Sequence, residues 1–200
     1  MCGFLVVFSK KENILQYKKL FNQSLELLHH RGPDSTKFYI DKNCYIGFKR
    51  LRILDLNSRS DQPMISQNGR FILVFNGEIY NFKELKKELK KENCKFHTSS
   101  DTEVILKGYE LYSSNFFFRL VGMWSIIIYD KKKKKLIISR DRIGIKQLYY
   151  SKDNDNFIFS NEIKSIKELI EKKHNKKIGL NYNFIKRFLI NANHQTKFET

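Results

Sequence analysis

The chain begins MCGFLVVFS (residues 1–9), in which a cysteine at position 2 directly precedes an apolar run rich in β-branched and aromatic residues. Such a run predicts a buried strand from Phe4 to Ser9. If the initiator methionine is removed, Cys2 carries both a thiol and a free α-amino group. Their ordinary pKa values, about 8.5 and about 8, allow proton exchange near neutral pH. Cys2 is therefore a candidate nucleophile with its own general base. The alternative is a small apolar residue that opens a buried strand.

The rest of the chain alternates pairs of helices with groups of strands. Apolar residues at steps of three and four predict a helix between Ile14 and Leu28. Asn81 and Ser100 are each followed three residues later by a glutamate, which predicts two capped helix starts. Strands are expected over 37–40, 44–51, 71–76, 124–129, 136–139, 147–151 and 156–160, and further helices over 162–171 and 182–190. Helix pairs between antiparallel strands predict an α+β sandwich with its sheets between helices.

Composition limits the class of protein. A chain of 200 residues, 41% of them hydrophobic, is sufficient for one domain with a buried core. The formal net charge of +17 raises the alternative of a nucleic-acid-binding module, but 29 of the 38 basic residues are lysines, whereas base recognition relies on arginine. No apolar run approaches a membrane span, and the N-terminus lacks a charged leader. We therefore expect a cytoplasmic protein without membrane or nucleic-acid partners.

The three cysteines, Cys2, Cys44 and Cys94, form an odd set without a C-x-x-C pair. Neither a disulfide framework nor a zinc site fits this pattern. We expect three free thiols and no metal site.

The stretch FNGEIYN (residues 75–81) ends an apolar strand and opens a helix. The Asn76 side-chain amide and the Gly77 backbone N–H are adjacent donors that can stabilise a developing oxyanion, and glycine lets the backbone approach a substrate closely. This pair suits acyl transfer. The alternative is an ordinary turn, because Asn-Gly is a common turn dipeptide.

Two arginines, Arg50 and Arg52, lie in the stretch RLRILD (residues 50–55) at the end of a predicted strand. Alternation along a strand places both on one face, opposite Leu51 and Ile53, so one guanidinium can hold a substrate carboxylate in a bidentate manner. The alternative is a pair of surface charges.

An acidic residue and a tight turn complete the candidates. Asp101 lies in the first turn of the helix after Ser100, where the helix dipole stabilises a carboxylate that can receive a substrate ammonium. Capping alone also explains this pattern. The turn RGPD (residues 31–34) either lies over a site or only ends a helix.

Together these groups describe a site for a free α-amino acid with a side-chain carbonyl, and glutamine has that chemistry. The sequence resembles the class II glutamine amidotransferases, which have an N-terminal cysteine nucleophile, and is most similar to the glutaminase domain of asparagine synthetases. The resemblance covers nearly the whole chain. It rests on eight motifs in the family's order: MCG (1–3), RGPD (31–34), RLRI (50–53), QPM (62–64), NGEIYN (76–81), SDTE (100–103), RDRIG (140–144) and FSNEIK (159–164).

The resemblance implies a four-layer αββα sandwich of the N-terminal-nucleophile hydrolase type and glutamine hydrolysis through a thioester. It makes Cys2 the nucleophile and Asn76 with the Gly77 N–H the oxyanion hole. It assigns the glutamine α-carboxylate to Arg50 and the α-ammonium to Asp101. The other expected pocket residues are Leu51, Ile53 and Glu78, and the residues expected to cover the pocket are Arg31, Gly32, Pro33 and Asp34.

The resemblance also implies a partner for residues 1–200, which correspond to the glutaminase domain. The family's synthetase domain has an SGGxDS phosphate loop that does not occur in this sequence. We therefore expect a synthetase partner, in the same or a separate chain, that uses ATP and Mg²⁺, and no cofactor in the glutaminase domain itself. Aspartate is the expected ammonia acceptor, and the alternative is a sugar acid or another carboxylate in surface-polysaccharide synthesis. A homodimer is one possible assembly.

Overall fold

The computed structural model describes residues 1–153 and 155–191, and its strands form two antiparallel sheets. The strand order is β2-β3-β1-β9-β8 in the first sheet and β4-β5-β6-β7 in the second. The first sheet consists of β1 (Gly3–Ser9), β2 (Ser35–Ile40), β3 (Cys44–Arg50), β8 (Tyr149–Asp153) and β9 (Asn156–Ser160). The second consists of β4 (Met64–Ile65), β5 (Phe71–Ile79), β6 (Gly122–Asp130) and β7 (Lys135–Arg140).

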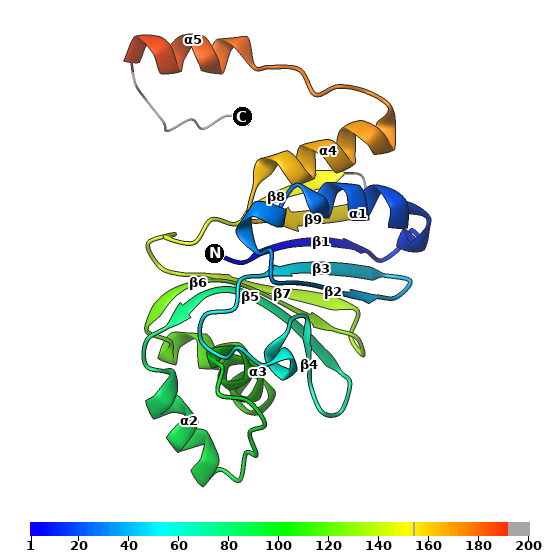
Figure 1. The fold of residues 1–200 in the computed structure, drawn as a ribbon. Coiled ribbons are helices and arrows are strands. Elements are labelled where there is room, and N and C mark those ends of the chain that lie inside the picture. The colour runs from blue at the N-terminus through cyan, green and yellow to red at the C-terminus, as the bar shows by residue number, and fades with distance from the viewer. Residues whose placement is uncertain (154, 192–200) are drawn as a thin grey trace.

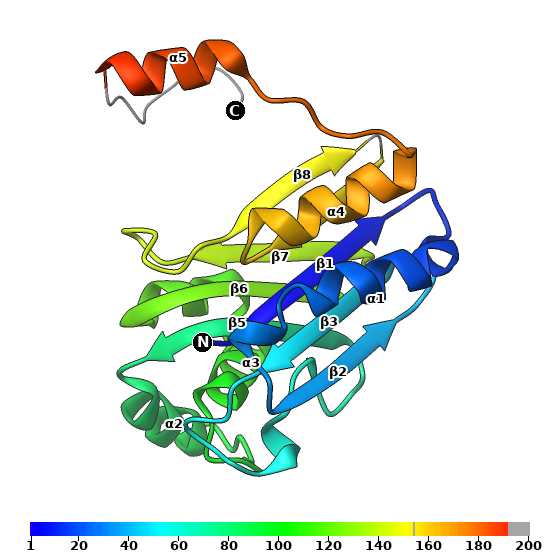
Figure 2. The same cartoon turned by 45° about the horizontal axis from the view of Figure 1, so that its top comes forward.

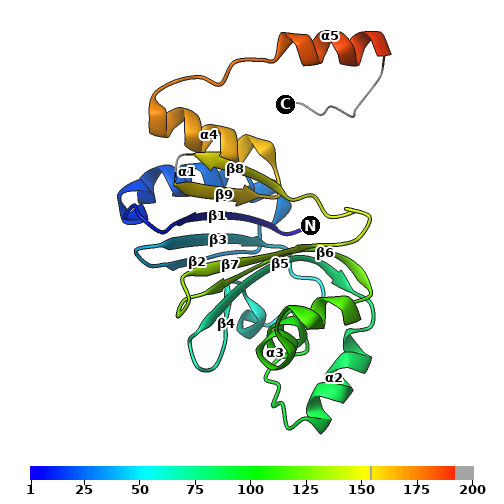
Figure 3. The same ribbon diagram turned by 180° about the vertical axis from the view of Figure 1, so that it is seen from behind.

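Helices cover the outer face of each sheet. The helices α1 (Lys18–Glu26) and α4 (Ile163–His174) pack on the first sheet, and α2 (Phe82–Lys91) and α3 (Asp101–Tyr112) lie on the far side of the second (Figures 1 and 3). The layers therefore run helix, sheet, sheet, helix. This arrangement confirms the expected α+β fold, a four-layer αββα sandwich.

Alternation of side chains along the strands decides which residues lie between the two sheets. Phe4 and Val6 of β1 and Val74 of β5 belong to the apolar cluster between them. Cys2 precedes Phe4 by two residues and packs against the same cluster. Asn76 follows Val74 by two residues and is 3% exposed. The sequence thus directs the cysteine and the asparagine side chains toward the same inter-sheet layer.

The helix expected between Ile14 and Leu28 is divided in the structure. It consists of the 3-10 helix η1 (Ile14–Tyr17), α1 and the 3-10 helix η2 (His29–Arg31). The Asn13 side chain accepts a hydrogen bond from the Leu15 N–H at 3.2 Å and caps η1 separately. The apolar spacing nevertheless predicts burial correctly, because Ile14 and Leu28 are at most 1% exposed.

The two expected helix caps differ in outcome. Ser100 caps α3 by accepting a hydrogen bond from the Glu103 N–H at 3.4 Å. The Asn81 side chain makes no cap on α2 and instead bonds the Arg119 carbonyl and the Val121 N–H, each at 3.0 Å. A tertiary contact with the segment before β6 therefore replaces the expected local one.

The remaining elements are the 3-10 helices η3 (Ser58–Ser60) and η4 (Ser113–Arg119) and the helix α5 (Tyr182–Asn191). α5 follows an extended segment and lies apart from the sheets (Figures 1 and 2). Among the described residues, no helix combines the length and the apolar character needed to cross a membrane. The end of the expected domain, residues 192–200, lies outside the described residues.

Candidate active site

A pocket of about 110 Å³ opens where β1 begins and where β3 and β5 end. The start of α3 forms another wall, and the segment between β3 and β4 completes it. The lining residues are Cys2, Arg50, Leu51, Ile53, Leu54, Asp55, Ser60, Gln62, Phe75, Gly77, Glu78, Ser100, Asp101 and Thr102. The pocket therefore brings together most of the expected site residues from four separate parts of the sequence.

The Cys2 thiol lies against the backbone of Leu51. Its Sγ accepts a hydrogen bond from the Leu51 N–H at 3.4 Å and donates one to the Leu51 carbonyl at 3.5 Å. Burial raises the pKa of the Cys2 thiol, while the Leu51 hydrogen bond and the nearby N-terminus, Arg50 and Arg31 act in the opposite direction. The thiol is therefore protonated at neutral pH and needs a base to become a nucleophile.

Asn76 offers a buried donor that nothing else uses. Among the described residues its Nδ2 has no hydrogen-bond partner, and its backbone carbonyl accepts a hydrogen bond from Ser125 Oγ at 3.3 Å. An unsatisfied buried donor costs about 1–3 kcal/mol, so such a group calls for a partner, either a bound water or a ligand group. Asn76 lies on the inter-sheet side of β5, behind the lining of the pocket.

Gly77 is required by the approach of a neighbouring strand. A Cβ atom at this position would lie 2.1 Å from the Met123 carbonyl oxygen and 2.8 Å from the Trp124 Cα, both backbone atoms of β6. No side chain fits without movement of the strands. Gly77 lines the pocket directly, so the strand packing and the access to its backbone depend on the same missing side chain.

Arg50 is buried and its guanidinium is held by the segment between β3 and β4. Its Nη1 donates to Asp61 Oδ1 at 2.5 Å and to the Asn57 carbonyl at 3.0 Å, and its Nη2 donates to the Asp55 carbonyl. A guanidinium has five N–H donors. Three described contacts leave two of them for a carboxylate in the pocket. Arg52, the alternative, also reaches Asp61 at 3.6 Å but does not line the pocket.

Asp101 and Glu78 place two carboxyl groups in the lining of the pocket. Asp101 is 6% exposed, and its Oδ2 accepts a hydrogen bond from the Ile79 N–H at 3.1 Å. Burial raises the pKa of Asp101 to about 6, and the charge of Glu78 acts in the same direction, against the backbone hydrogen bonds. Glu78 itself is exposed. A buried carboxylate of this kind is well suited to receive an ammonium group.

The turn expected to cover the pocket, residues 31–34, does not line it. Arg31 Nε donates to the Cys2 carbonyl at 3.0 Å, and Asp34 Oδ2 accepts from the Arg52 N–H at 2.7 Å. Gly32 packs so closely on β3 that a Cβ would lie 2.2 Å from the Lys49 carbonyl oxygen. The turn thus contacts Cys2 through its backbone carbonyl, and its role as a cover stays a prediction.

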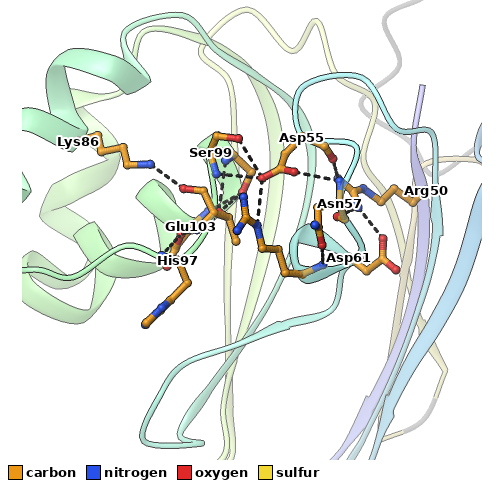
Figure 4. A network of polar contacts seen from close by, with 11 residues as sticks. Arg50, Asp55, Asn57, Asp61, Lys86, His97, Ser99 and Glu103 are labelled. Carbon is orange, nitrogen blue, oxygen red and sulfur yellow. Dashed lines mark hydrogen bonds and ion pairs between the residues drawn. The ribbon is translucent and has the colours of Figure 1, made fainter.

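Two residues that the sequence analysis did not select hold the pocket wall. Asp55 accepts hydrogen bonds from the Ser99 N–H at 2.9 Å and Ser99 Oγ at 3.0 Å, which joins the Arg50 segment to the residues before α3 (Figure 4). Burial raises the pKa of Asp55, but hydrogen bonds from Ser99 and Asn57 outweigh this effect and hold that pKa below its usual range. The carboxylate therefore stays ionised.

Gln62 is the second such residue, and its side chain hydrogen-bonds the backbone of β5. Its Oε1 accepts from the Phe75 N–H at 2.6 Å and its Nε2 donates to the Phe75 carbonyl at 3.1 Å. Nε2 also reaches Thr102 Oγ1 at 3.4 Å. In the sequence this position is marked by the QPM motif (62–64), one of the motifs that carry the family resemblance.

No group of three or more histidine, cysteine, aspartate or glutamate side chains in the described residues is arranged to hold a metal ion. Cys44 and Cys94 lie outside the pocket.

Comparison with known proteins agrees with this chemistry. The family model described as "Glutamine amidotransferase domain" matches residues 1–200. Asparagine synthetase [glutamine-hydrolyzing] 1 of Bacillus subtilis is 39% identical over 168 residues, and the maize protein named asparagine synthetase [glutamine-hydrolyzing] is 38% identical over 173. These alignments cover 83% and 86% of the chain. The chain spans only 26% and 29% of the length of these two relatives.

Solved structures give the same fold. A Bacillus subtilis glutamine phosphoribosylpyrophosphate amidotransferase, complexed with ADP and GMP, superimposes with a TM-score of 0.67 at 21% identity. The superposition covers 84% of this chain and 43% of that one. At this identity the match supports the fold, and the chemistry depends on the residues described above.

Proposed function

The chain belongs to the glutamine amidotransferase domain family, and we propose that Cys2 is its nucleophile in the hydrolysis of glutamine to glutamate and ammonia. The observation that carries this proposal is that Cys2 lines the same pocket as Phe75 and Gly77, the β5 neighbours of Asn76, whose side-chain Nδ2 has no partner among the described residues. A nucleophile and an oxyanion donor thus belong to adjacent parts of one site.

The reaction begins when the Cys2 α-amino group, freed by removal of Met1, takes the thiol proton. Sγ attacks the side-chain carbonyl carbon of glutamine, and the electron pair of the C=O bond moves to oxygen. Asn76 Nδ2 and the Gly77 N–H then donate to that oxyanion. The C–N bond then breaks as the Cys2 α-amino group returns the proton to the substrate nitrogen, which leaves as ammonia. The acyl group remains on Cys2 Sγ as a thioester. Water attacks the thioester, and glutamate leaves with recovery of the thiol.

Substrate recognition uses two walls of opposite charge. The remaining Arg50 donors hold the glutamine α-carboxylate, and the Asp101 carboxylate holds the α-ammonium. Leu51, Ile53 and Glu78 complete the pocket around the side chain. The Arg31 to Asp34 turn is retained as the proposed cover when glutamine is bound.

The ammonia released by this domain is expected to be consumed by a partner. We propose a synthetase partner that amidates aspartate with ATP and Mg²⁺, because the relatives named above are glutamine-hydrolysing asparagine synthetases. Those names support aspartate over the sugar-acid alternative. They also support an amidotransferase over a nucleic-acid-binding module. Homodimer formation and a cytoplasmic location remain predictions.

The test is a glutaminase assay on protein shown by intact mass to begin at Cys2. Cys2→Ala should abolish glutamate release, whereas Cys94→Ala, a matched change of a half-buried thiol outside the pocket, should leave it unchanged. Protein that retains Met1 should be inactive, because its amine is not on Cys2. Undiminished glutamate release by Cys2→Ala would overturn the mechanism.

A further inference from the structure

The N-terminal residues are held by three consecutive side chains of one motif. Ser160 Oγ donates to the Phe4 carbonyl at 3.0 Å, and Asn161 Oδ1 accepts from the Phe4 N–H at 3.0 Å. The next residue, Glu162, contacts Arg31, which in turn contacts the backbone of Cys2. The three side chains belong to the FSNEIK motif, for which the proposed function offers no role. Because chain termini fray unless they are tied down, a nucleophile at position 2 needs such support.

Glu162 is linked to the nucleophile by one intervening side chain. Its Oε1 accepts from Arg31 Nη1 at 3.0 Å, and Arg31 Nε donates to the Cys2 carbonyl at 3.0 Å. The Arg31 side chain is 11% exposed and that of Glu162 is 20% exposed. A guanidinium is planar and rigid, so a carboxylate that fixes one of its nitrogens also fixes the direction of the others.

Two further basic side chains approach the same carboxylate. His30 Nε2 lies 2.8 Å from Glu162 Oε1, and Lys164 Nζ lies 3.1 Å from Oε2. Burial raises the pKa of Glu162, but its hydrogen bonds with Arg31, Lys164 and His30 act more strongly together and lower that pKa. The Glu162 carboxylate is therefore ionised at neutral pH and can hold the Arg31 guanidinium.

We propose that Glu162 is a positioning residue for the nucleophile: it fixes the Arg31 guanidinium on the Cys2 carbonyl and thereby the direction of the thiol and the α-amine. Glu162 touches neither the pocket nor the thiol. Its effect passes through Arg31. This inference rests on the proposed role of Cys2.

The experiment compares Glu162→Gln with Glu168→Gln in the full chain that begins at Cys2. Both glutamates lie on or beside α4, and Glu168 pairs with Lys172 at 2.6 Å, outside the pocket. We expect Glu162→Gln to lower kcat for glutamine hydrolysis roughly 10-fold to 100-fold, because small misplacements of reacting groups have effects of this size. The KM for glutamine should stay within about twofold of the parent, since substrate contacts are unchanged. Glu168→Gln should match the parent in both.

A chemical readout separates positioning from general damage. Glu162→Gln should change the rate of Cys2 alkylation by iodoacetamide at fixed pH, while its thermal midpoint stays with that of Glu168→Gln. Arg31→Lys should lower kcat as well, because a lysine ammonium cannot reproduce the rigid guanidinium that contacts Glu162 and the Cys2 carbonyl at the same time. The double variant should lose no more than Arg31→Lys alone, since both changes break the same link.

Three outcomes would overturn the inference: a parental kcat in Glu162→Gln, a loss confined to KM, or losses that multiply in the double variant. None of these results bears on whether Cys2 is the nucleophile. That question is decided separately by Cys2→Ala, so failure of the positioning role and failure of the proposed function are distinguishable.

Discussion

Arg50 and Asp61 form an ion pair at 2.5 Å in which each side chain is only 7% exposed. Arg50 ends β3, whereas Asp61 belongs to the segment that leads to β4. The pair therefore fixes a wall of the pocket to the end of a strand and aims the guanidinium. A buried pair of this kind makes each partner depend on the other, because an uncompensated charge left in the interior is costly.

Replacing Asp61 should damage stability and substrate binding together. Asp61→Ala leaves the Arg50 charge buried without its partner, so we expect the free energy of unfolding to fall by roughly 3 kcal/mol. The KM for glutamine should rise at least roughly tenfold, because the guanidinium loses its direction. Urea unfolding and steady-state kinetics measure the two effects. Asp130→Ala is the matched control, since Asp130 pairs with Arg70 away from the pocket. A KM that rises equally in both variants would contradict the role of Arg50.

Every strand except β4, which has only two residues, was accessible from the sequence because apolar patterning is a local signal. The four-layer order was implied by the family resemblance. The position of Asp101 was accessible from a local signal as well, since Ser100 begins its helix as expected. Asp61 and Gln62 were not, because their partners Arg50 and Phe75 lie 11 and 13 residues away and the connecting segment has no regular pattern. The Asn81 cap failed because a tertiary contact replaced it.

Asn76→Ala should lower kcat with little change in KM. The Asn76 amide is proposed to bind the side-chain oxygen of glutamine more strongly once that oxygen becomes an oxyanion, and loss of one such donor costs roughly 100-fold to 1,000-fold in rate. Asn156→Ala is a suitable control, because Asn156 is another buried asparagine. It begins β9 and pairs with Ser9, the last residue of β1, whereas Cys2 precedes the first residue of that strand. Asn156→Ala should keep the parental kcat. Equal losses of kcat in the two variants would point to general damage in place of a lost donor.

Gly77→Ala should affect the fold and the site together. The new methyl group would overlap the Met123 carbonyl oxygen of β6, so β5 must shift. Overpacking of this kind costs about 1–3 kcal/mol, and we expect the shift to displace the proposed oxyanion donor and remove most of the glutaminase activity. Gly179→Ala is the matched control, because nothing lies within 4 Å of its Cβ position. If Gly77→Ala keeps full activity, the backbone of Gly77 has no part in the reaction.

Asp101→Asn should stabilise the fold at neutral pH while weakening glutamine binding. Burial raises the pKa of Asp101 to about 6, above an ordinary value of about 3.9. The folded state therefore holds more protons than the unfolded state between these values, and stability falls as pH rises from about 4 to about 6, by roughly 3 kcal/mol in total. Asparagine stays neutral and its carbonyl can still accept from the Ile79 N–H. Urea unfolding at several pH values should show a flatter pH dependence in the variant.

The same titration of Asp101 should affect substrate binding in the opposite direction: deprotonation lowers the stability of the fold but strengthens the binding of glutamine. Only the ionised Asp101 attracts the glutamine α-ammonium, so the KM of the parent should rise about tenfold for each pH unit below about 6. Asp101→Asn should show a high KM with little pH dependence across that range. Asp130→Asn, whose carboxyl pairs with Arg70, should keep the parental profile. A variant that keeps the parental KM at every pH would show that the Asp101 carboxylate does not bind the glutamine α-ammonium.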